Sequence, residues 1–203
     1  MALKTHVLIS SVNNLSDARY CAGMHVNYIG FGFEKTDNNY IPRETFKELT
    51  EWLSGVDFVG EFSHYETQDV RMTLQDYGTK YVQIKDKTQV EQLQLDGFTV
   101  FLTIDINDWV SLEGIRPNYL VVESSHEKLT KEELNIIKNL SATRKVFIGA
   151  GITKENVESI LSETNAHGVA LQGGDEIRPG YKDYDELADI LETLEVDDMA
   201  IGN

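Results

Sequence analysis

The stretch Lys145–Leu161, KVFIGAGITKENVESIL, contains both parts of one βα unit. Its first part, KVFIGAG, is a short apolar run that ends in glycines, as expected of a buried strand in a parallel sheet. Thr153 follows as a candidate N-cap, and the apolar residues of KENVESIL have the spacing of a helix that packs one face against a sheet. The stretch therefore predicts a strand followed directly by a helix.

The same alternation of apolar runs and amphipathic stretches continues along the whole chain. Most amphipathic stretches end at a glycine, which accepts the left-handed backbone that terminates a helix; these are Gly23, Gly55, Gly78, Gly97 and Gly114. With Val7–Ser11 as the first strand and Gly168–Gly174 as the last, the pattern gives about eight strands. We predict an α/β fold: one compact TIM (βα)8 barrel over residues 1–203, with 195–203 as a frayed tail. A doubly wound open sheet is the alternative, because the sequence does not show whether the first and last strands pair.

Composition limits the classes of function. The chain has 203 residues and a formal net charge of −16, and it has no cluster of Lys and Arg with which to bind nucleic acid. No apolar run approaches the ~20 residues of a membrane span, and MALKTHVLIS lacks the features of a secretory signal. One cysteine, Cys21, allows no internal disulfide. We therefore expect a cytoplasmic protein that binds neither nucleic acid nor membrane.

Two glycine-rich strand ends, IGAGITKENV and ALQGGDEIRPGYKD, are candidate phosphate sites. Glycines let backbone N–H groups approach an anion closely, and the N-terminus of the next helix adds partial positive charge. In barrels, the loops after strands 7 and 8 commonly hold phosphate. We predict a phosphorylated small-molecule ligand at Gly149, Gly151, Gly173 and Gly174, with no cofactor, because neither a dinucleotide fingerprint nor a Walker A lysine is present. Tight turns alone would also explain these glycines.

Several motifs resemble those of phosphoribosylanthranilate isomerases. GVALQGGDEIRPGYKD is similar to that family's G-V-D-V-S-S-G-V-E-x-x-P-G-x-K-D, FIGAGITKENV to L-A-G-G-L-x-P-E-N-V, and VLISSVNNLSDA to V-K-I-C-G-I-T-N-x-x-D-A. YIGFGFEKTDNNYI, VGEFSH and YVQIKD resemble I-G-F-x-F-x-x-x-S-P-R-Y-I, V-G-V-F-V-N and V-Q-L-H-G. The matches run in order along nearly the whole chain. The resemblance implies a (βα)8 barrel that performs an Amadori rearrangement in tryptophan biosynthesis.

The resemblance also implies roles for particular positions, and this chain departs from the family at several of them. Ser10 stands where the family has the cysteine that takes a proton from C2 of the ribose, and Ser11 where it has glycine. Glu123 replaces the aspartate that protonates the ring oxygen, and Asn39 replaces the arginine that holds the anthranilate carboxylate. Lys85 replaces a histidine, whereas Gln83 is kept. These residues, with Asp105, are the candidate site: Ser10, Glu123 and Lys85 for catalysis, Gln83, Asn39 and Asp105 for substrate binding.

The replacements predict weak isomerase activity. A cysteine with an unperturbed pKa of ~8.5 can be tuned into a base, but a serine hydroxyl needs another group to activate it. Exchanging Asp for Glu moves the carboxyl by a methylene, and a misplacement of ~1 Å can cost on the order of 100-fold in rate. Asn39 cannot imitate a bidentate arginine. Cys21 lies in the helix after the first strand, so it cannot supply the base.

The charged strand ends leave other functions open. Glu61, Lys85, Asp105 and Glu123 are expected at the carboxyl ends of strands 3 to 6, where Lys85 could clamp a substrate, shuttle protons with Glu123 or form a Schiff base. A solvated network of ion pairs would explain the same residues. A non-catalytic phosphosugar-binding relative and a different barrel enzyme that uses Lys85 and Glu123 therefore remain alternatives. No histidine spacing supports a metal site.

Overall fold

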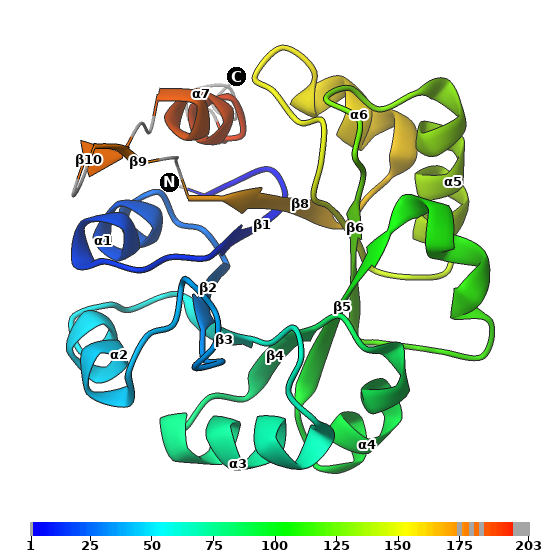
Figure 1. Cartoon of the computed structure of the whole chain (residues 1–203). Helices are drawn as coiled ribbons and strands as arrows, with labels where there is room; N and C mark the ends of the chain where they lie inside the picture. The colour runs from blue at the N-terminus through cyan, green and yellow to red at the C-terminus, as the bar shows by residue number, and fades with distance from the viewer. Residues whose placement is uncertain (1, 174–175, 179–180, 183–184, 197–203) are drawn as a thin grey trace.

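The computed structural model describes residues 2–173, 176–178, 181–182 and 185–196. Eight parallel strands form a closed barrel in which neighbours in sequence are neighbours in space and β1 pairs with β8 (Figure 1). This pairing confirms the predicted TIM barrel and excludes the open sheet. The strands are β1 His6–Ser10, β2 Tyr28–Gly32, β3 Asp57–Glu61, β4 Tyr81–Ile84, β5 Thr99–Asp105, β6 Tyr119–Glu123, β7 Val146–Ile148 and β8 Gly168–Gln172.

Helices surround this barrel, as Figure 1 shows in a view into its opening. One crossover differs from the others: between β5 and β6 the chain forms a 3-10 helix, η2, in place of an α-helix, which agrees with the short apolar pattern of NDWVSLEG. A short antiparallel pair, β9 Glu176–Arg178 and β10 Tyr181–Lys182, precedes the last helix. The helical segments are α1 Leu15–Gly23, α2 Arg43–Thr50, α3 Thr67–Tyr77, η1 Lys87–Gln89, α4 Val90–Leu95, η2 Ile106–Leu112, α5 Lys131–Ser141, α6 Val157–Thr164 and α7 Asp185–Thr193.

The strands bury both of their faces, which explains their continuous apolar runs. Side chains alternate between the barrel interior and the layer beneath the helices. The interior is filled by one cluster of buried residues, Leu8, Tyr28, Val59, Phe101, Val121, Phe147 and Ala170. A larger cluster packs the outer face of the strands against the helices. The filled interior leaves space for ligands only at the ends of the barrel.

The predicted left-handed backbone at a glycine after a helical stretch is confirmed at four of the five positions. Gly55, Gly78, Gly97 and Gly114 have φ values of +79°, +73°, +91° and +77°. Gly23 is still part of α1, and the left-handed residue there is His25, with φ +58°. Histidine adopts this conformation less readily than glycine, so its residue type does not predict a helix end here.

The first residues of the helices agree with the sequence patterns less often than the strands do. Thr130 caps α5, since its side chain accepts from Glu133 N–H while the Glu133 side chain accepts from Thr130 N–H in a capping box. The predicted cap at Thr153 is wrong, because Thr153 begins a turn closed by Asn156 and α6 starts only at Val157. The helical pattern of DYDELADILETL predicts a start at Asp183 for the last helix, and this residue lies outside the described residues.

The two ends of the described chain pair with each other. Leu3 pairs with Glu195 in an antiparallel bridge, and Val196 N–H donates to the Ala2 carbonyl at 2.9 Å. Of the tail predicted to be frayed, 197–203 lies outside the described residues.

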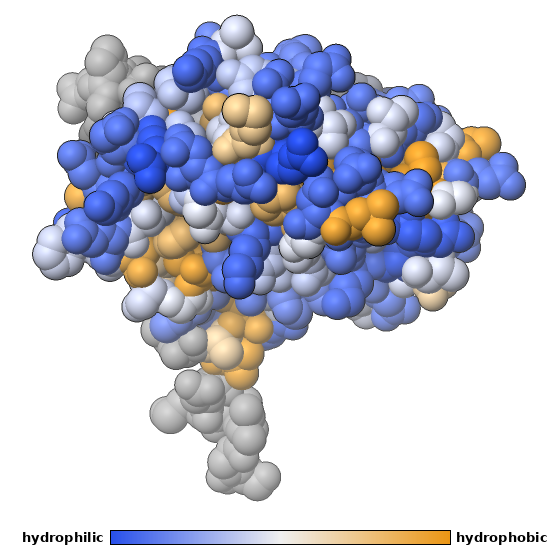
Figure 2. All heavy atoms as spheres, turned by 90° about the horizontal axis from the view of Figure 1, so that it is seen from below, coloured by the Kyte–Doolittle hydropathy of each residue, from blue (hydrophilic) through white to orange (hydrophobic). Residues whose placement is uncertain are grey.

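The face drawn in Figure 2 is mainly hydrophilic, with hydrophobic side chains in small separate groups. Among the described residues, the exposed large hydrophobic side chains are spread over four segments: Trp52 after α2, Met72 in α3, Leu95 in α4, and the adjacent Trp109 and Val110 in η2. Isolated exposure of this kind is normal for a protein surface. Within the described part of the chain, no helix is long and apolar enough to cross a membrane.

Candidate active site

A polar layer closes the barrel interior at the carboxyl ends of the strands. Here the inward positions change from large apolar to polar or small residues, and a cavity of about 140 Å³ opens above Val121 and Ala170. In TIM barrels, catalytic residues occupy this end. The cavity is lined by Ser10, Ser11, Asp37, Glu61, Phe62, Ser63, Gln83, Lys85, Thr103, Val121, Glu123, Gly149, Ala170, Leu171 and Gln172.

Ser10 and Ser11 meet the carboxyl group of Glu61 across the barrel mouth. Ser11 N–H lies 3.1 Å from both carboxyl oxygens of Glu61, and Ser11 Oγ donates to Oε2 at 3.3 Å. The hydroxyl of Ser10 lies near this carboxyl group and acts to lower its pKa. Ser11 has φ +59°, a conformation that favours glycine. The hydrogen bonds to Glu61 hold Ser11 in this strained turn.

The position of Glu61 depends on a glycine in the neighbouring strand. A Cβ atom on Gly30 would lie 1.9 Å from Oε1 of Glu61, so only glycine leaves room for the carboxyl group. Burial raises the pKa of Glu61 to about 7, against the lowering effect of hydrogen bonds from Ser11 and Ser10, and the negative charge of Asp37 adds to the rise. Glu61 is therefore a carboxyl group that exchanges a proton near neutral pH.

Gln83 and Thr103 form the next part of the wall. Gln83 Nε2 donates to Thr103 Oγ1 at 3.0 Å. Gln83 Oε1 is buried and has no hydrogen-bond partner within the described residues. A buried acceptor without a donor costs free energy, so this oxygen is suited to receive a hydrogen bond from a ligand in the cavity.

Lys85 and Glu123 complete the charged part of the lining. Lys85 is exposed at the mouth, and no ion pair within 4.0 Å joins it to a carboxylate of the described residues. Glu123 lies against Gly149, where an added Cβ would be 3.4 Å from Cγ of Glu123. The exposed position of Lys85 gives no support to the Schiff-base alternative, which needs a desolvated amine.

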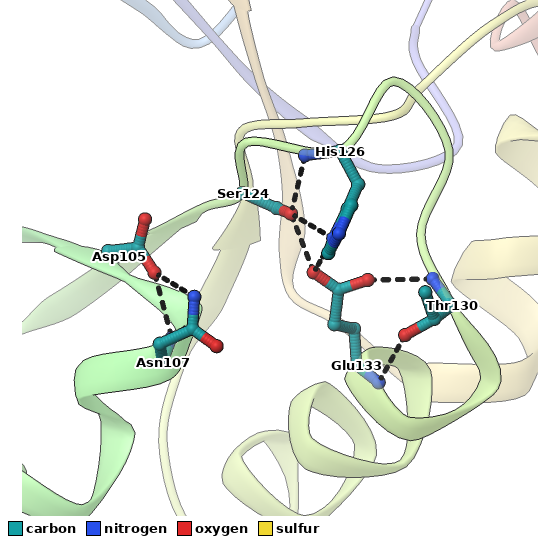
Figure 3. A network of polar contacts seen from close by, with 6 residues as sticks. All are labelled: Asp105, Asn107, Ser124, His126, Thr130 and Glu133. Carbon is teal, nitrogen blue, oxygen red and sulfur yellow. Dashed lines mark hydrogen bonds and ion pairs between the residues drawn. The ribbon is translucent and has the colours of Figure 1, made fainter.

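Two predicted substrate residues lie outside the lining of this cavity. Asn39 is in the loop after β2, where its N–H donates to Oδ1 of Asp37, and it is Asp37 that faces the cavity. Asp105 caps η2 by accepting from the N–H and Nδ2 of Asn107 at 2.9 and 2.8 Å (Figure 3). The structure thus brings Ser10, Gln83, Lys85 and Glu123 together, but not Asn39 or Asp105.

The predicted phosphate glycines differ in their surroundings. The N–H of Gly149 donates to the Val122 carbonyl at 2.8 Å and that of Gly173 to the Ser10 carbonyl at 3.3 Å, so both belong to the sheet. Gly151 has φ +67° and begins the turn before α6. The N–H groups of Ala150–Ile152 have no acceptor among the described residues. Gly174 lies outside the described residues.

A second polar network lies in the loop between β6 and α5 (Figure 3). Ser124 Oγ donates to Glu133 Oε1 at 2.6 Å, and His126 Nδ1 lies 3.0 Å from the same oxygen. Hydrogen bonds from Ser124, Thr130 and His126 outweigh burial and lower the pKa of Glu133 to about 2. Ser124 Oγ also lies 3.4 Å from His126 Nδ1, but its one proton goes to the nearer carboxylate of Glu133, so the network is no hydrolase triad. It anchors the loop that follows Glu123.

Histidines and carboxylates do not gather into a metal site in the described part of the chain, where no three His, Cys, Asp or Glu residues form a group that could hold an ion. The prediction that no metal is used remains a prediction.

Glu61 is the site residue that sequence reasoning missed. It was recognised as a charged strand end but given no role, because nothing in VGEF indicates which partner its carboxyl group meets. The available signal is non-local. Gly30 of β2 pairs with Val59 of β3, two residues before Glu61, and the absent side chain of Gly30 leaves the space that the Glu61 carboxyl group fills.

The chain is similar to one enzyme family along most of its length. The sequence profile of N-(5'-phosphoribosyl)anthranilate (PRA) isomerase matches residues 8–193. An N-(5'-phosphoribosyl)anthranilate isomerase of Gloeothece citriformis (strain PCC 7424) is 23% identical over an alignment of 204 positions that covers 93% of each chain.

Solved structures of such isomerases share the fold. Monomers generated from the dimeric Thermotoga maritima enzyme match with a TM-score of 0.77 and 20% identity over 94% of this chain and 98% of that one. The Thermus thermophilus enzyme matches with a TM-score of 0.77 and 19% identity over 93% and 98%. An isomerase in complex with reduced 1-(o-carboxyphenylamino)-1-deoxyribulose 5-phosphate matches with a TM-score of 0.72 and 18% identity over 94% and 98%.

Proposed function

The chain belongs to the N-(5'-phosphoribosyl)anthranilate isomerase family, and we propose that it catalyses an isomerisation of that type on a phosphoribosyl-arylamine substrate. The observation that supports this most is the cavity at the carboxyl end of the barrel, where Ser10, Gln83, Lys85 and Glu123 face one another. A related structure was obtained with a reduced 5-phosphate analogue, which has the same chemical parts as the proposed substrate.

Glu123 is the proposed general acid. It ends β6, lines the cavity and stands at the position of the family's aspartate. In this role its carboxyl group donates a proton to the ring oxygen of the ribose, so that the C1–O bond breaks and the ring opens to a protonated imine. Gly149 leaves space for the longer side chain of glutamate, because its missing Cβ lies beside Cγ of Glu123.

Lys85 and Gln83 are the proposed substrate-binding residues. The ammonium group of Lys85, at the mouth of the cavity, would face the carboxylate of the arylamine in place of an arginine. The unpaired Oε1 of Gln83 would accept a hydrogen bond from a ribose hydroxyl or the amine N–H. Since Lys85 is a point charge without bidentate geometry, we expect weaker discrimination among aromatic carboxylates than an arginine gives.

The turn before α6 is the proposed phosphate site. Gly151 gives it a left-handed backbone, and the N–H groups of Ala150–Ile152 have no acceptor among the described residues. Successive backbone N–H groups near a helix N-terminus favour an anion, even in a chain whose net charge is −16. Gly149 and Gly173 would shape this site, since their own N–H groups are used in the sheet.

A combined binding and turnover measurement tests the proposal. The purified protein would be titrated calorimetrically with reduced 1-(o-carboxyphenylamino)-1-deoxyribulose 5-phosphate and, separately, with inorganic phosphate, and assayed by the fluorescence loss of freshly formed phosphoribosylanthranilate. We expect binding of the analogue and slow turnover, and growth of an isomerase-deficient strain at high expression. Binding without turnover would favour a non-catalytic phosphosugar-binding protein. No binding would contradict both functions.

A further inference from the structure

Glu61 occupies the place where a base is needed and Ser10 cannot supply one. Its carboxyl group accepts from the N–H and Oγ of Ser11, the residue after Ser10, and lines the same cavity as Ser10 and Glu123. We infer that Glu61 is the general base of this enzyme, taking over from a strand-1 side chain the removal of the proton from C2 of the ribose. This inference rests on the proposed function and adds a catalytic residue to it.

The contacts of Glu61 fix its carboxyl group at this place. Ser11 binds it from β1's end through both N–H and Oγ, at 3.1 and 3.3 Å. On β2, Gly30 leaves the space that the carboxyl group fills. A group fixed from two neighbouring strands is preorganised, as a base must be to reach a proton on carbon.

The electrostatic surroundings suit a base that works near neutral pH. Burial is the largest influence and raises the pKa of Glu61 to about 7, so that both protonation states are populated there. The other charged groups that line the cavity are Asp37, Lys85 and Glu123. Two carboxyl groups from β3 and β6 thus face one space and can divide the roles of base and acid.

The proposed step conserves atoms and electrons. After Glu123 has given its proton to the ring oxygen, the C1–O bond breaks and the C1–N bond becomes a protonated imine, from which ionised Glu61 takes the C2 proton. The C2–H electron pair forms the C1=C2 bond, and the imine nitrogen is neutralised. Glu61 then returns its proton to C1, while the C2 hydroxyl proton restores Glu123. C1 is reduced and C2 is oxidised within one molecule, and no co-reactant is consumed.

Glu34 shows how a carboxylate with only a structural role differs. It is buried and accepts from Ser63 N–H at 2.8 Å and His64 N–H at 2.9 Å, much as Glu61 accepts from Ser11. These hydrogen bonds outweigh burial and lower its pKa, and it does not line the cavity. Glu34→Gln is therefore the matched control for Glu61→Gln.

The test compares Glu61→Gln, Glu61→Asp and Glu34→Gln with the wild-type protein. The expected loss in kcat for Glu61→Gln is on the order of 100-fold or more, with a nearly unchanged Kd for the reduced analogue. Glu61→Asp is expected to keep part of the activity, and Glu34→Gln to keep kcat close to wild type. Thermal melts at pH 8 separate catalysis from folding: removing a buried negative charge should leave Glu61→Gln at least as stable as the wild type.

A second variant restores a base from β1. Ser10→Cys in the Glu61→Gln background is expected to regain activity, with a pH profile set by the thiol. Wild-type kcat in Glu61→Gln would overturn the inference and leave the proposed function standing. Absence of turnover in the wild type would overturn the proposed function itself, and the inference with it. Equal losses in Glu61→Gln and Glu34→Gln, or a lowered Tm that parallels the loss, would mean that Glu61 is only structural.

Discussion

Ser11 has the left-handed φ of +59° that its strand-to-helix turn requires, although it is not glycine. Such backbone conformations cost of order 1–3 kcal/mol in a non-glycine residue and persist where the surroundings enforce them. Here the surroundings are the carboxyl oxygens of Glu61, which accept from both the N–H and the hydroxyl. Strain in the turn and the protonation of Glu61 are therefore linked through one residue.

Ser11→Ala tests this link at the scale of one hydroxyl. The hydrogen bond from Ser11 Oγ lowers the pKa of Glu61, so its removal should raise that pKa above its value of about 7. If ionised Glu61 is the base, the acidic limb of kcat against pH should move to higher pH in Ser11→Ala. An unchanged or lowered midpoint would mean that the limb belongs to another group.

Of the site residues predicted from the sequence, those that line the cavity are Ser10, Gln83, Lys85, Glu123 and Gly149. Asn39 and Asp105 do not, because their side chains serve a loop and a helix cap whose local bonds cannot be read from alignment alone. Glu61 was missed for a related reason: its pKa and position depend on Ser11 and Gly30, which come from other strands.

At the scale of elements, substitutions at two glycines on adjacent strands are expected to have different effects, one on activity and one on stability. Gly30 on β2 faces Glu61, whereas a Cβ on Gly60 of β3 would lie 2.6 Å from the Phe33 ring, on the helix side of the sheet. Gly30→Ala should displace the Glu61 carboxyl group and lower kcat by at least ~10-fold. Gly60→Ala should lower stability by about 1–3 kcal/mol through overpacking, with Glu61 left in place.

Steady-state kinetics and urea unfolding of both variants check this prediction. Loss of activity in Gly60→Ala without a loss of stability, or full activity in Gly30→Ala, would show that the alternation of these strands does not control the position of Glu61.

The start of α5 gives a prediction about stability. Glu133 closes a capping box and accepts from Ser124, and the pKa of its carboxyl group is lowered to about 2. Since this value lies below the ordinary 4.5, Glu133 stabilises the fold above about pH 4.5, and this contribution is lost as pH falls toward 2. Glu133→Gln should cost about 1–2 kcal/mol at pH 7.

Urea unfolding at pH 7 and near pH 3 measures this contribution, with Glu132→Gln, at the neighbouring exposed position of the same helix turn, as control. A difference between Glu133→Gln and the wild type that does not shrink at the lower pH would contradict the capping role.

The order of elements was predictable because it depends on local patterns. Strands that are buried on both faces read as apolar runs, and Gly55, Gly78, Gly97 and Gly114 adopt the left-handed backbone that their residue type favours. The predicted cap at Thr153 failed because Asn156 competes for the same turn through its side chain, which accepts from Thr153 N–H and donates to the Gly151 carbonyl. Closure of the barrel could be argued only from even spacing, since no local pattern reports the pairing of β1 with β8.

At the scale of the whole molecule, the pairing of β1 with β8 closes the barrel. Aromatic residues pack around this pair at the end of the barrel opposite the candidate site. His6, next to Gly168 across the β1–β8 pair, stacks on His167 with ring centroids 4.1 Å apart, and Tyr119 stacks on His167 at 5.6 Å. Burial, with the nearby His6 and Lys145, lowers the pKa of His167 to about 4. The stack is thus built around a neutral imidazole.

Acid should therefore weaken the barrel at its closure. An unfolded chain protonates His167 near pH 6.5, whereas the folded chain does so only near pH 4. Stability that depends on a neutral His167 is fully present above pH 6.5 and falls as pH decreases from there toward 4. His167→Gln should lose less stability than the wild type between pH 7.5 and about pH 5 in urea unfolding. An equal loss in both proteins would place the acid sensitivity elsewhere.

The two ends of the barrel thus have different chemistry. Aromatic side chains pack the end at which the strands begin, whereas at the carboxyl ends of the strands Glu61 and Glu123 line one polar cavity. The most direct measurement on the central claim is kcat/KM of the purified wild-type protein for phosphoribosylanthranilate between about pH 5 and pH 9. If Glu61 is the base, the protein turns this substrate over with an acidic limb whose midpoint lies near the Glu61 pKa of about 7. No turnover at any pH, or turnover whose rate is flat across neutral pH, would contradict it.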